Sequence, residues 1–287
     1  MPADSQVPNW TSPGARRHAC QSAVTAPPGC AACFCLATGL DWPICSSLQH
    51  MRLRAVYFDL DDTLCETTRF AHTARRNAVQ AMLAHGVRAS AEQVLQELDE
   101  VIAEFTSNYE HHFDKLLLRL EPSALEGVNR SLVIAAGVAA YHDTKFRELR
   151  VAEGALELLS DLRRAGLGVG VISHGRTLKQ AEKLVRLGIA PLLDHNAVII
   201  SDEVGINKPN PKLFQLALRL GGYQAFETMY VGDHPHNDIA PPRSLGMVTV
   251  WARAMARTEL GDEKPDHTID NFSDLRRILR ESYSIAV

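Results

Sequence analysis

Short apolar runs and helix-length amphipathic segments alternate along most of this chain. The apolar runs are brief and rich in Val, Ile and Leu, which is typical of buried strands, whereas the segments between them repeat their apolar residues with a helical period. The predicted strands are 53–60, 167–172, 197–200, 229–231 and 247–251, and the predicted helices between them are 153–165, 178–187, 211–220 and 239–245. Strands that alternate with helices of this length predict an α/β core with a parallel sheet covered on both faces.

Residues 67–150 interrupt this rhythm, because helical periodicity is continuous there and strand-like runs are absent. The helices predicted in this segment are 70–85, 91–104, 109–120 and 132–146. An all-helical insert directly after the first strand is expected to lie above the carboxyl edge of the sheet, where α/β proteins place their sites. We therefore predict a catalytic core of residues 52–66 and 151–287 and a helical cap domain of residues 67–150.

Residues 1–51 differ in composition from the rest, since Pro, Ser, Ala, Gly and Cys dominate without a sustained period. We predict a flexible or disordered N-terminal extension. Five of the six cysteines lie in it, so a disulfide framework for the folded part is not expected. Cys30 and Cys33 have the spacing of zinc ligands, but no second pair follows at the distance of a zinc finger, and no metal site is predicted there.

The bulk composition is that of an ordinary soluble protein, with 287 residues, 46% hydrophobic, 22% charged and a net charge of -4. The absence of a basic excess argues against a nucleic-acid partner. No apolar run reaches the roughly 18 residues that cross a bilayer, which argues against a membrane protein. We expect a cytoplasmic protein, either a monomer or a homodimer.

Polar residues follow the predicted strands at their carboxyl ends, and these ends meet at one edge of a parallel sheet. The motifs are Asp59-Leu60-Asp61-Asp62-Thr63, Ser173-His174-Gly175, Asn207-Lys208-Pro209, and Gly232-Asp233 followed by Asp238. Three acids at the end of a buried strand are unfavourable unless they are paired, so this concentration of charge indicates a metal ion or a reaction.

The four motifs, in this order, resemble those of the haloacid dehalogenase-like (HAD) hydrolase superfamily. The resemblance covers residues 53–279, and the helical insert is similar to the C1-type cap of the phosphatase branch. It implies a Rossmann-like parallel-sheet core with an inserted all-helical cap. The Pro241-Pro242 pair departs from the small residues usual at this point of the family, and because Pro is tolerated only in the first turn of a helix, we expect this helix to start late or to be kinked.

Two of the acids suit the hydrolysis of a phosphate monoester. Asp59 can attack phosphorus and form an aspartyl-phosphate. Asp61 can protonate the departing alkoxide and later deprotonate the attacking water, for which neighbouring carboxylates are expected to raise its pKa. Asp62 is interpreted as the polar residue of the turn.

A hard cation fits the remaining acids, and Mg2+ suits a site of few carboxylates, phosphate oxygens and water. Asp59 and Asp233 are the expected ligands, and the resemblance implies that Asp61 adds its backbone carbonyl and that Asp238 supports the site. His234 and His236 could be read as transition-metal ligands, but oxygen-only ligation fits the family better.

The oxygens of the phosphate need donors. Ser173 can offer its hydroxyl, and the amides of His174 or Gly175 lie where the chain enters a helix. Lys208 can offset charge on both the nucleophile and the phosphate. Thr63 can hold the loop after the nucleophile, although a simple helix cap would look the same.

The leading interpretation is a Mg2+-dependent phosphatase for a small phosphorylated metabolite. A phosphomutase, a haloacid dehalogenase and a catalytically silent binding protein remain alternatives, although a halide leaves without a proton and so does not require Asp61. Polar residues of the cap could contact the substrate and determine its choice; these are Arg69, His72, Arg75, Arg76, Tyr109, His111 and His112.

Overall fold

The computed structural model describes residues 52–287, so the predicted extension and its cysteine pair lie outside the described residues. The described part contains a six-stranded, wholly parallel sheet in the order β3-β2-β1-β4-β5-β6. The strands are β1 (Ala55–Phe58), β2 (Gly168–Ser173), β3 (Val198–Ile200), β4 (Thr228–Gly232), β5 (Val248–Ala252) and β6 (His267–Ile269). The predicted α/β fold with a parallel sheet is confirmed.

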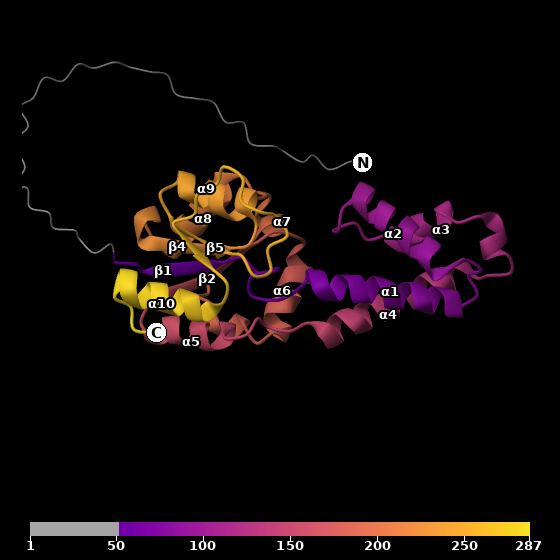
Figure 1. The fold of residues 1–287 in the computed structure, drawn as a ribbon, viewed down its shortest axis with the longest axis horizontal. Helices are drawn as coiled ribbons and strands as arrows, with labels where there is room; N and C mark the ends of the chain where they lie inside the picture. The colour runs from indigo at the N-terminus through magenta and orange to yellow at the C-terminus, as the bar shows by residue number, and fades with distance from the viewer. Residues whose placement is uncertain (1–51) are drawn as a thin grey trace, which may run out of the picture. The chain divides into compact units, whose positions relative to one another are not determined.

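Both faces of the sheet are covered by helices, as Figure 1 shows. In β1, Val56 and Phe58 pack in one apolar cluster, and Ala55 and Tyr57 pack in another on the opposite face, as the alternation of a strand requires. Helices α5 (Ala155–Arg164), α6 (Thr177–Arg186) and α10 (Phe272–Tyr283) contribute to the first cluster, and α8 (Pro211–Gly221) contributes to the second. Because both faces are buried, β1, β2 and β4 are buried along their whole length.

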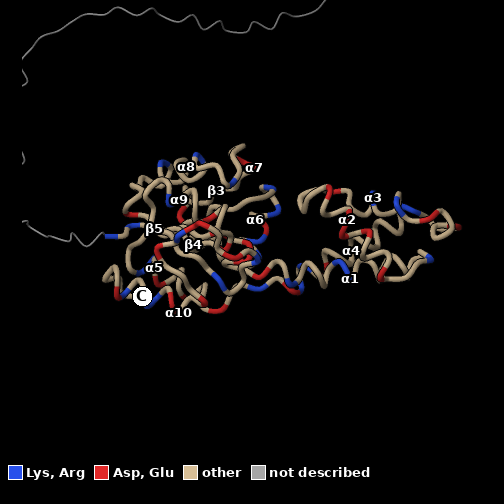
Figure 2. The backbone as a smooth tube through the Cα atoms, turned by 45° about the horizontal axis from the view of Figure 1, so that its top comes forward, with Lys and Arg blue, Asp and Glu red and all other residues tan. Residues whose placement is uncertain are grey.

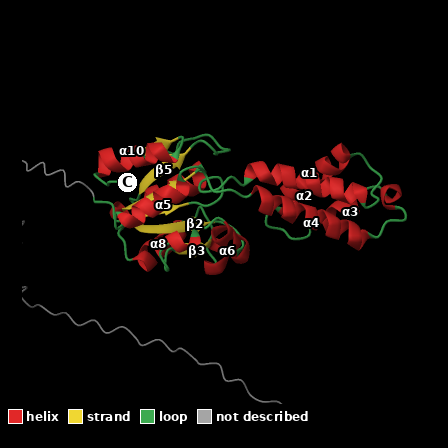
Figure 3. Ribbon diagram, turned by 90° about the horizontal axis from the view of Figure 1, so that it is seen from below, coloured by secondary structure: helices red, strands yellow, loops and turns green. Residues whose placement is uncertain are grey.

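Helices α1–α4 form a region with its own apolar cluster, and Figure 3 shows them as a helical group without strands. The helices are α1 (Thr68–Ala84), α2 (Ala91–Phe105), α3 (His112–Arg119) and α4 (Arg130–Glu148). Gly137 in α4 permits close contact with α1, since a Cβ there would lie 3.0 Å from the Met82 side chain. All four predicted helices of the insert are therefore present, with shifts at their ends.

Short helical elements connect the rest of the fold. They are the 3₁₀ turns Pro122–Leu125, Ala190–Leu192 and Ala225–Glu227, the π-helical turn Pro235–Ile239, α7 (Ser201–Val204) and α9 (Ala240–Ser244). Pro241 and Pro242 lie in the first turn of α9, where Pro is tolerated, and the π-helical turn runs directly into this helix.

Acidic and basic residues are interspersed along both the sheet region and helices α1–α4 (Figure 2). Within residues 52–287, no helix combines the length and the apolar character needed to span a bilayer.

Candidate active site

Three carboxylates meet at the carboxyl edge of the sheet. Asp59 directly follows β1, Asp233 directly follows β4, and Asp238 lies in the π-helical turn beyond it. One oxygen of each lies within 4.8 Å of an oxygen of the other two, and all three residues are buried. We call Asp59, Asp233 and Asp238 the carboxylate cluster. Gly232 makes room for it, because a Cβ there would lie 2.5 Å from Cβ of Asp238.

Lys208 is the cation of this cluster. Its buried ammonium group donates to Asp59 Oδ1 at 2.6 Å, to Asp238 Oδ1 at 2.7 Å and to the Tyr230 hydroxyl at 2.6 Å. These three contacts use the full donor capacity of an ammonium group. Tyr230 in turn lies 3.1 Å from the carbonyl oxygen of Ile172, its hydroxyl acting as donor. Lys208 is thus held in place from two strands and a turn.

The carboxylate cluster holds more negative charge than Lys208 neutralises. Burial raises the pKa of Asp59 to about 7, against the effect of Lys208 and with a further contribution from Asp238. Burial, Asp59 and Asp238 raise the pKa of Asp233 to about 9. Three crowded carboxylates with one cation form an oxygen-rich site that carries a net negative charge once the carboxylates are ionised, and such a donor set fits a divalent cation like Mg2+.

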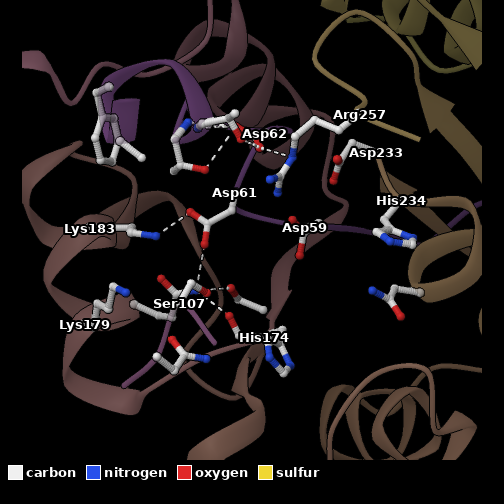
Figure 4. Close-up of a pocket in the computed structure, with 18 of the residues that line it drawn as sticks. Asp59, Asp61, Asp62, Ser107, His174, Lys179, Lys183, Asp233, His234 and Arg257 are labelled. Atoms are coloured by element: carbon white, nitrogen blue, oxygen red, sulfur yellow. Dashed lines mark hydrogen bonds and ion pairs between the residues drawn. The ribbon is translucent and has the colours of Figure 1, made fainter. Parts of the chain in front are cut away.

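Asp61 points away from the carboxylate cluster toward α6, as Figure 4 shows. Its carboxylate forms an ion pair with Lys183 and accepts a hydrogen bond of 2.9 Å from Gln180 Nε2. Burial raises the pKa of Asp61, but Lys183 and Gln180 lower it by more, so the pKa lies below its ordinary value. The expected increase in the pKa of Asp61 from neighbouring carboxylates is therefore wrong for this structure, and the reason is Lys183, a buried lysine of α6.

The phosphate-binding candidates are only partly brought together. Ser173 ends β2, and its buried hydroxyl oxygen accepts from Gln180 Nε2 at 3.1 Å, which leaves its proton free to donate. His174 lines the same cavity and is exposed. The amide of Gly175 is already used, since it donates to Ser201 Oγ at 3.0 Å.

Thr63 lies apart from these groups. Its hydroxyl is buried, has no hydrogen-bond partner among residues 52–287, and does not line the cavity. Its suggested phosphate role stays a prediction without support from a contact.

Asp62 does more than occupy a turn. It is 3% exposed and has a positive φ of 54°. Its Oδ1 accepts from the amides of Thr67 at 2.8 Å and Thr68 at 3.0 Å, the residues at the start of α1. Asp62 therefore supplies acceptors for the free N–H groups of this helix and fixes where α1 begins.

The motifs open onto a cavity of about 510 Å3 between the sheet edge and helices α1 and α4. The sequence-derived residues that line it are Asp59, Asp61, Ser173, His174, Lys208, Asp233 and Asp238.

Of the candidate cap residues, His72 and Arg75 line this cavity, whereas Tyr109 and His112 line an adjoining one of about 610 Å3. Arg69, Arg76 and His111 line neither. His234 also lines the first cavity, but within the described chain the grouped metal-ligand candidates are carboxylates only.

Four residues of the site were missed from the sequence. Tyr230, which binds Lys208, lies inside an apolar strand, and Lys145, which lines the cavity, lies in the helical insert. Lys179 and Lys183 share one face of α6 through their four-residue spacing, and that spacing was the available signal.

The comparisons with known proteins agree with this geometry. The family described as haloacid dehalogenase-like hydrolase matches residues 53–246. The chain therefore belongs to the haloacid dehalogenase-like hydrolases. The HAD hydrolase YfnB from Bacillus subtilis, crystallised with magnesium, superposes with a TM-score of 0.57 at 19% identity, over 79% of this chain and 99% of that one. At this level of identity the likeness shows the fold, and in this fold helices α1–α4 resemble the HAD cap.

Two relatives share more of the sequence. The glyceraldehyde 3-phosphate phosphatase of Pyrococcus abyssi is 44% identical over 69% of this chain and 81% of its own length. The glyceraldehyde 3-phosphate phosphatase of Methanopyrus kandleri is 40% identical over 80% of this chain and 98% of its own length. These relatives confirm the predicted enzyme class, a HAD phosphatase.

Proposed function

We propose that the chain hydrolyses a small phosphomonoester of triose size, with glyceraldehyde 3-phosphate as the first candidate, through an aspartyl-phosphate at Asp59. The observation that supports this most is the Lys208 ammonium shared between Asp59 and Asp238. It holds the carboxylate of Asp59 in place at the base of the cavity through Oδ1, and Oδ2 stays available to attack phosphorus. The relatives support the choice of glyceraldehyde 3-phosphate through the substrate in their names.

Catalysis of phosphoryl transfer depends mainly on position and charge neutralisation. Lys208 offsets charge on the nucleophile, and the free proton of the Ser173 hydroxyl can donate to a phosphate oxygen. Asp61 is ionised while it pairs with Lys183, so its carboxyl must first turn from Lys183 toward the substrate and take up a proton from water, which it then gives to the ester oxygen. In the second half-reaction the ionised form, which Lys183 favours, suits a base that deprotonates the attacking water.

Asp59 and Asp233 would hold Mg2+, with Asp238 supporting the site through its bond to Lys208. Bound Mg2+ would neutralise part of the charge on the phosphate oxygens and on the crowded carboxylates. We further propose that α1–α4 are a C1-type cap of residues 67–150 on a core of residues 52–66 and 151–287. The cytoplasmic location and the monomeric or homodimeric state stay predictions.

The test is hydrolysis of p-nitrophenyl phosphate and of glyceraldehyde 3-phosphate by purified protein. Asp59→Asn should lower kcat by at least about a thousandfold, because the nucleophile is lost. Asp262→Asn, a matched change at an exposed residue, should leave kcat unchanged. Chelation of Mg2+ should abolish activity and added Mg2+ should restore it. Full activity of Asp59→Asn would refute the assignment of the nucleophile, and transfer of phosphate to a second hydroxyl instead of water would indicate a mutase.

A further inference from the structure

A cluster of lysines lines the cavity on the side away from the carboxylate cluster. It consists of Lys145 on α4 and of Lys179 and Lys183 on α6, and we call it the lysine cluster. The side chains of Lys145 and Lys183 are each 5% exposed, and Lys179 is partly buried. Figure 4 shows Lys179 and Lys183 on one side of Asp61, with Asp59 on the other. The cavity therefore has a cationic side and an anionic side.

The lysine cluster carries more positive charge than the acids around it. Asp61 pairs with Lys183. Lys145 lies 3.8 Å from Glu182, whose carboxylate also pairs with an arginine one turn along the helix. Lys179 has no carboxylate oxygen within 4.0 Å among residues 52–287. Three ammonium groups are thus matched by the carboxylate of Asp61 and by that of Glu182, which an arginine shares.

This arrangement is unfavourable for the protein alone. Lys179 and Lys183 are four residues apart on one helix face, where like charges destabilise a helix. Burial lowers the pKa of Lys179, and Lys183 and Lys145 lower it further. Burial also lowers the pKa of Lys145, with Lys183 as the next cause. An anion placed among these groups would relieve both the repulsion and the desolvation.

The other cations of the cavity already have partners. Lys208 donates to two carboxylates of the carboxylate cluster. Arg75 lies 3.0 Å from Asp99, a residue of α2. The lysine cluster is therefore where an incoming negative group finds uncompensated charge.

We propose that the lysine cluster is a second anion-binding subsite, which holds a carboxylate or a second phosphate group of a small phosphomonoester while its reacting phosphate lies at the carboxylate cluster. The inference rests on the proposed function, because it needs the phosphate at Asp59. Ammonium groups act as point charges and accept either anion. Among three-carbon esters, the chain accordingly binds those with an anionic far end more tightly than those with a neutral one, and glyceraldehyde 3-phosphate, whose far end is a neutral aldehyde, is a substrate that leaves this subsite unused.

The experiment compares three probes that share a three-carbon skeleton. Glycerol 3-phosphate has a neutral far end, 3-phosphoglycerate has a carboxylate there, and glycerol 1,3-bisphosphate has a second phosphate. Each is measured as a competitor of p-nitrophenyl phosphate hydrolysis, so that substrates and inhibitors both yield a Ki. We expect the Ki of at least one doubly anionic probe to be about tenfold lower than that of glycerol 3-phosphate, and the better probe identifies the preferred anion.

The matched variants are Lys179→Met, which removes the charge but keeps an unbranched side chain, and Lys212→Met at an exposed position of α8. Lys179→Met should reduce the tenfold preference to less than about threefold, and Lys212→Met should preserve it. Equal Ki values for all probes in the unaltered protein, or an undiminished preference in Lys179→Met, would overturn the subsite.

Failure of the proposed function can be distinguished from failure of the subsite. If the unaltered protein hydrolyses no ester, the proposed function fails, and the subsite is tested by calorimetric titration of 3-phosphoglycerate and glycerol 3-phosphate. A roughly tenfold tighter binding of 3-phosphoglycerate than of glycerol 3-phosphate, lost in Lys179→Met and kept in Lys212→Met, supports the subsite without turnover. Equal binding of the two ligands to the unaltered protein, or a preference that Lys179→Met leaves unchanged, overturns it. Thermal unfolding of each variant shows that it is folded.

Discussion

At the residue scale, the position of Lys208 depends on a tyrosine that takes no part in the four motifs. The Tyr230 hydroxyl accepts from Lys208 Nζ at 2.6 Å, and its single proton is within reach of the Ile172 carbonyl oxygen at 3.1 Å and of Asp238 Oδ1 at 3.2 Å. Burial raises the pKa of Tyr230, and the charge of Asp238 raises it further, so the hydroxyl keeps its proton at neutral pH. Its role is therefore to orient Lys208, and Lys208 orients Asp59.

Tyr230→Phe should lower kcat about tenfold, equivalent to about 1.4 kcal/mol of barrier, because Lys208 loses one of its three partners. The matched control is Tyr57→Phe, which removes a buried hydroxyl bonded to the Ala217 carbonyl oxygen at 3.2 Å, away from the cavity. That variant should lose about 1 kcal/mol of unfolding free energy and keep its kcat. Equal kcat values in the two variants would refute a positioning role for Tyr230.

At the element scale, the join between β1 and α1 carries both the nucleophile and the beginning of the helical region. Only nine residues separate Phe58 at the end of β1 from Thr68 at the start of α1. Asp62 holds this segment together through the amides of Thr67 and Thr68 and lies 3.5 Å from the Arg257 guanidinium. The geometry of the loop that contains Asp61 thus depends on a helix cap.

Asp62→Ala should destabilise the protein by about 2 kcal/mol, mainly because two helix N–H groups lose their buried acceptor. It should also lower kcat/KM about tenfold, since the loop around Asp61 is no longer fixed. Ser90→Ala provides the comparison, as it removes the capping box of α2 far from the carboxylate cluster. Urea unfolding should show a loss of about 1 kcal/mol there, with kcat/KM unchanged. An equal loss of activity in both variants would show that Asp62 acts through stability alone.

The pattern of apolar residues was sufficient to predict strands and helices with a strong periodicity. It was insufficient where tertiary contacts decide whether a strand or helix forms. Strands β1 and β2 are continuous apolar runs, so they were found within one or two residues of their ends. Strand β6 has three residues, only one of them buried, and it forms by pairing with β5; no periodic signal marks it. Helix α10, by contrast, was missed although its buried Phe272, Leu275 and Leu279 follow the helical period.

The site, too, could be predicted only in part from the sequence. The parallel sheet brings together residues that follow or lie near strand ends, and these include Asp59, Lys208 and Asp233. The pairing of Asp61 with Lys183 does not follow from the sheet, because 122 residues separate them and the helix rotation that brings them together is set by packing. A pKa inferred from neighbouring acids in the sequence was therefore wrong in direction.

At the scale of the whole molecule, the crowded carboxylates link stability to pH and metal. The pKa values of Asp59 and Asp233 are raised from 3.8 to about 7 and about 9. In the metal-free protein, the folded state therefore binds more protons than the unfolded chain from about pH 4 upward. The stability that these two groups contribute is fully present below pH 4 and is lost as the pH rises through 7 and 9.

We therefore expect the Tm of the metal-free protein to fall between pH 6 and pH 9. Mg2+ binds the ionised carboxylates, so it should raise the Tm more at pH 8 than at pH 6. Asp233→Asn removes the group with the larger shift, and it should flatten the metal-free pH profile and abolish the effect of Mg2+. Asp262→Asn, an exposed residue, should behave like the unaltered protein in scanning fluorimetry. A Tm that rises with pH in the absence of metal would show that Asp59 and Asp233 are not crowded in the folded protein. A full response to Mg2+ in Asp233→Asn would show that the metal binds elsewhere.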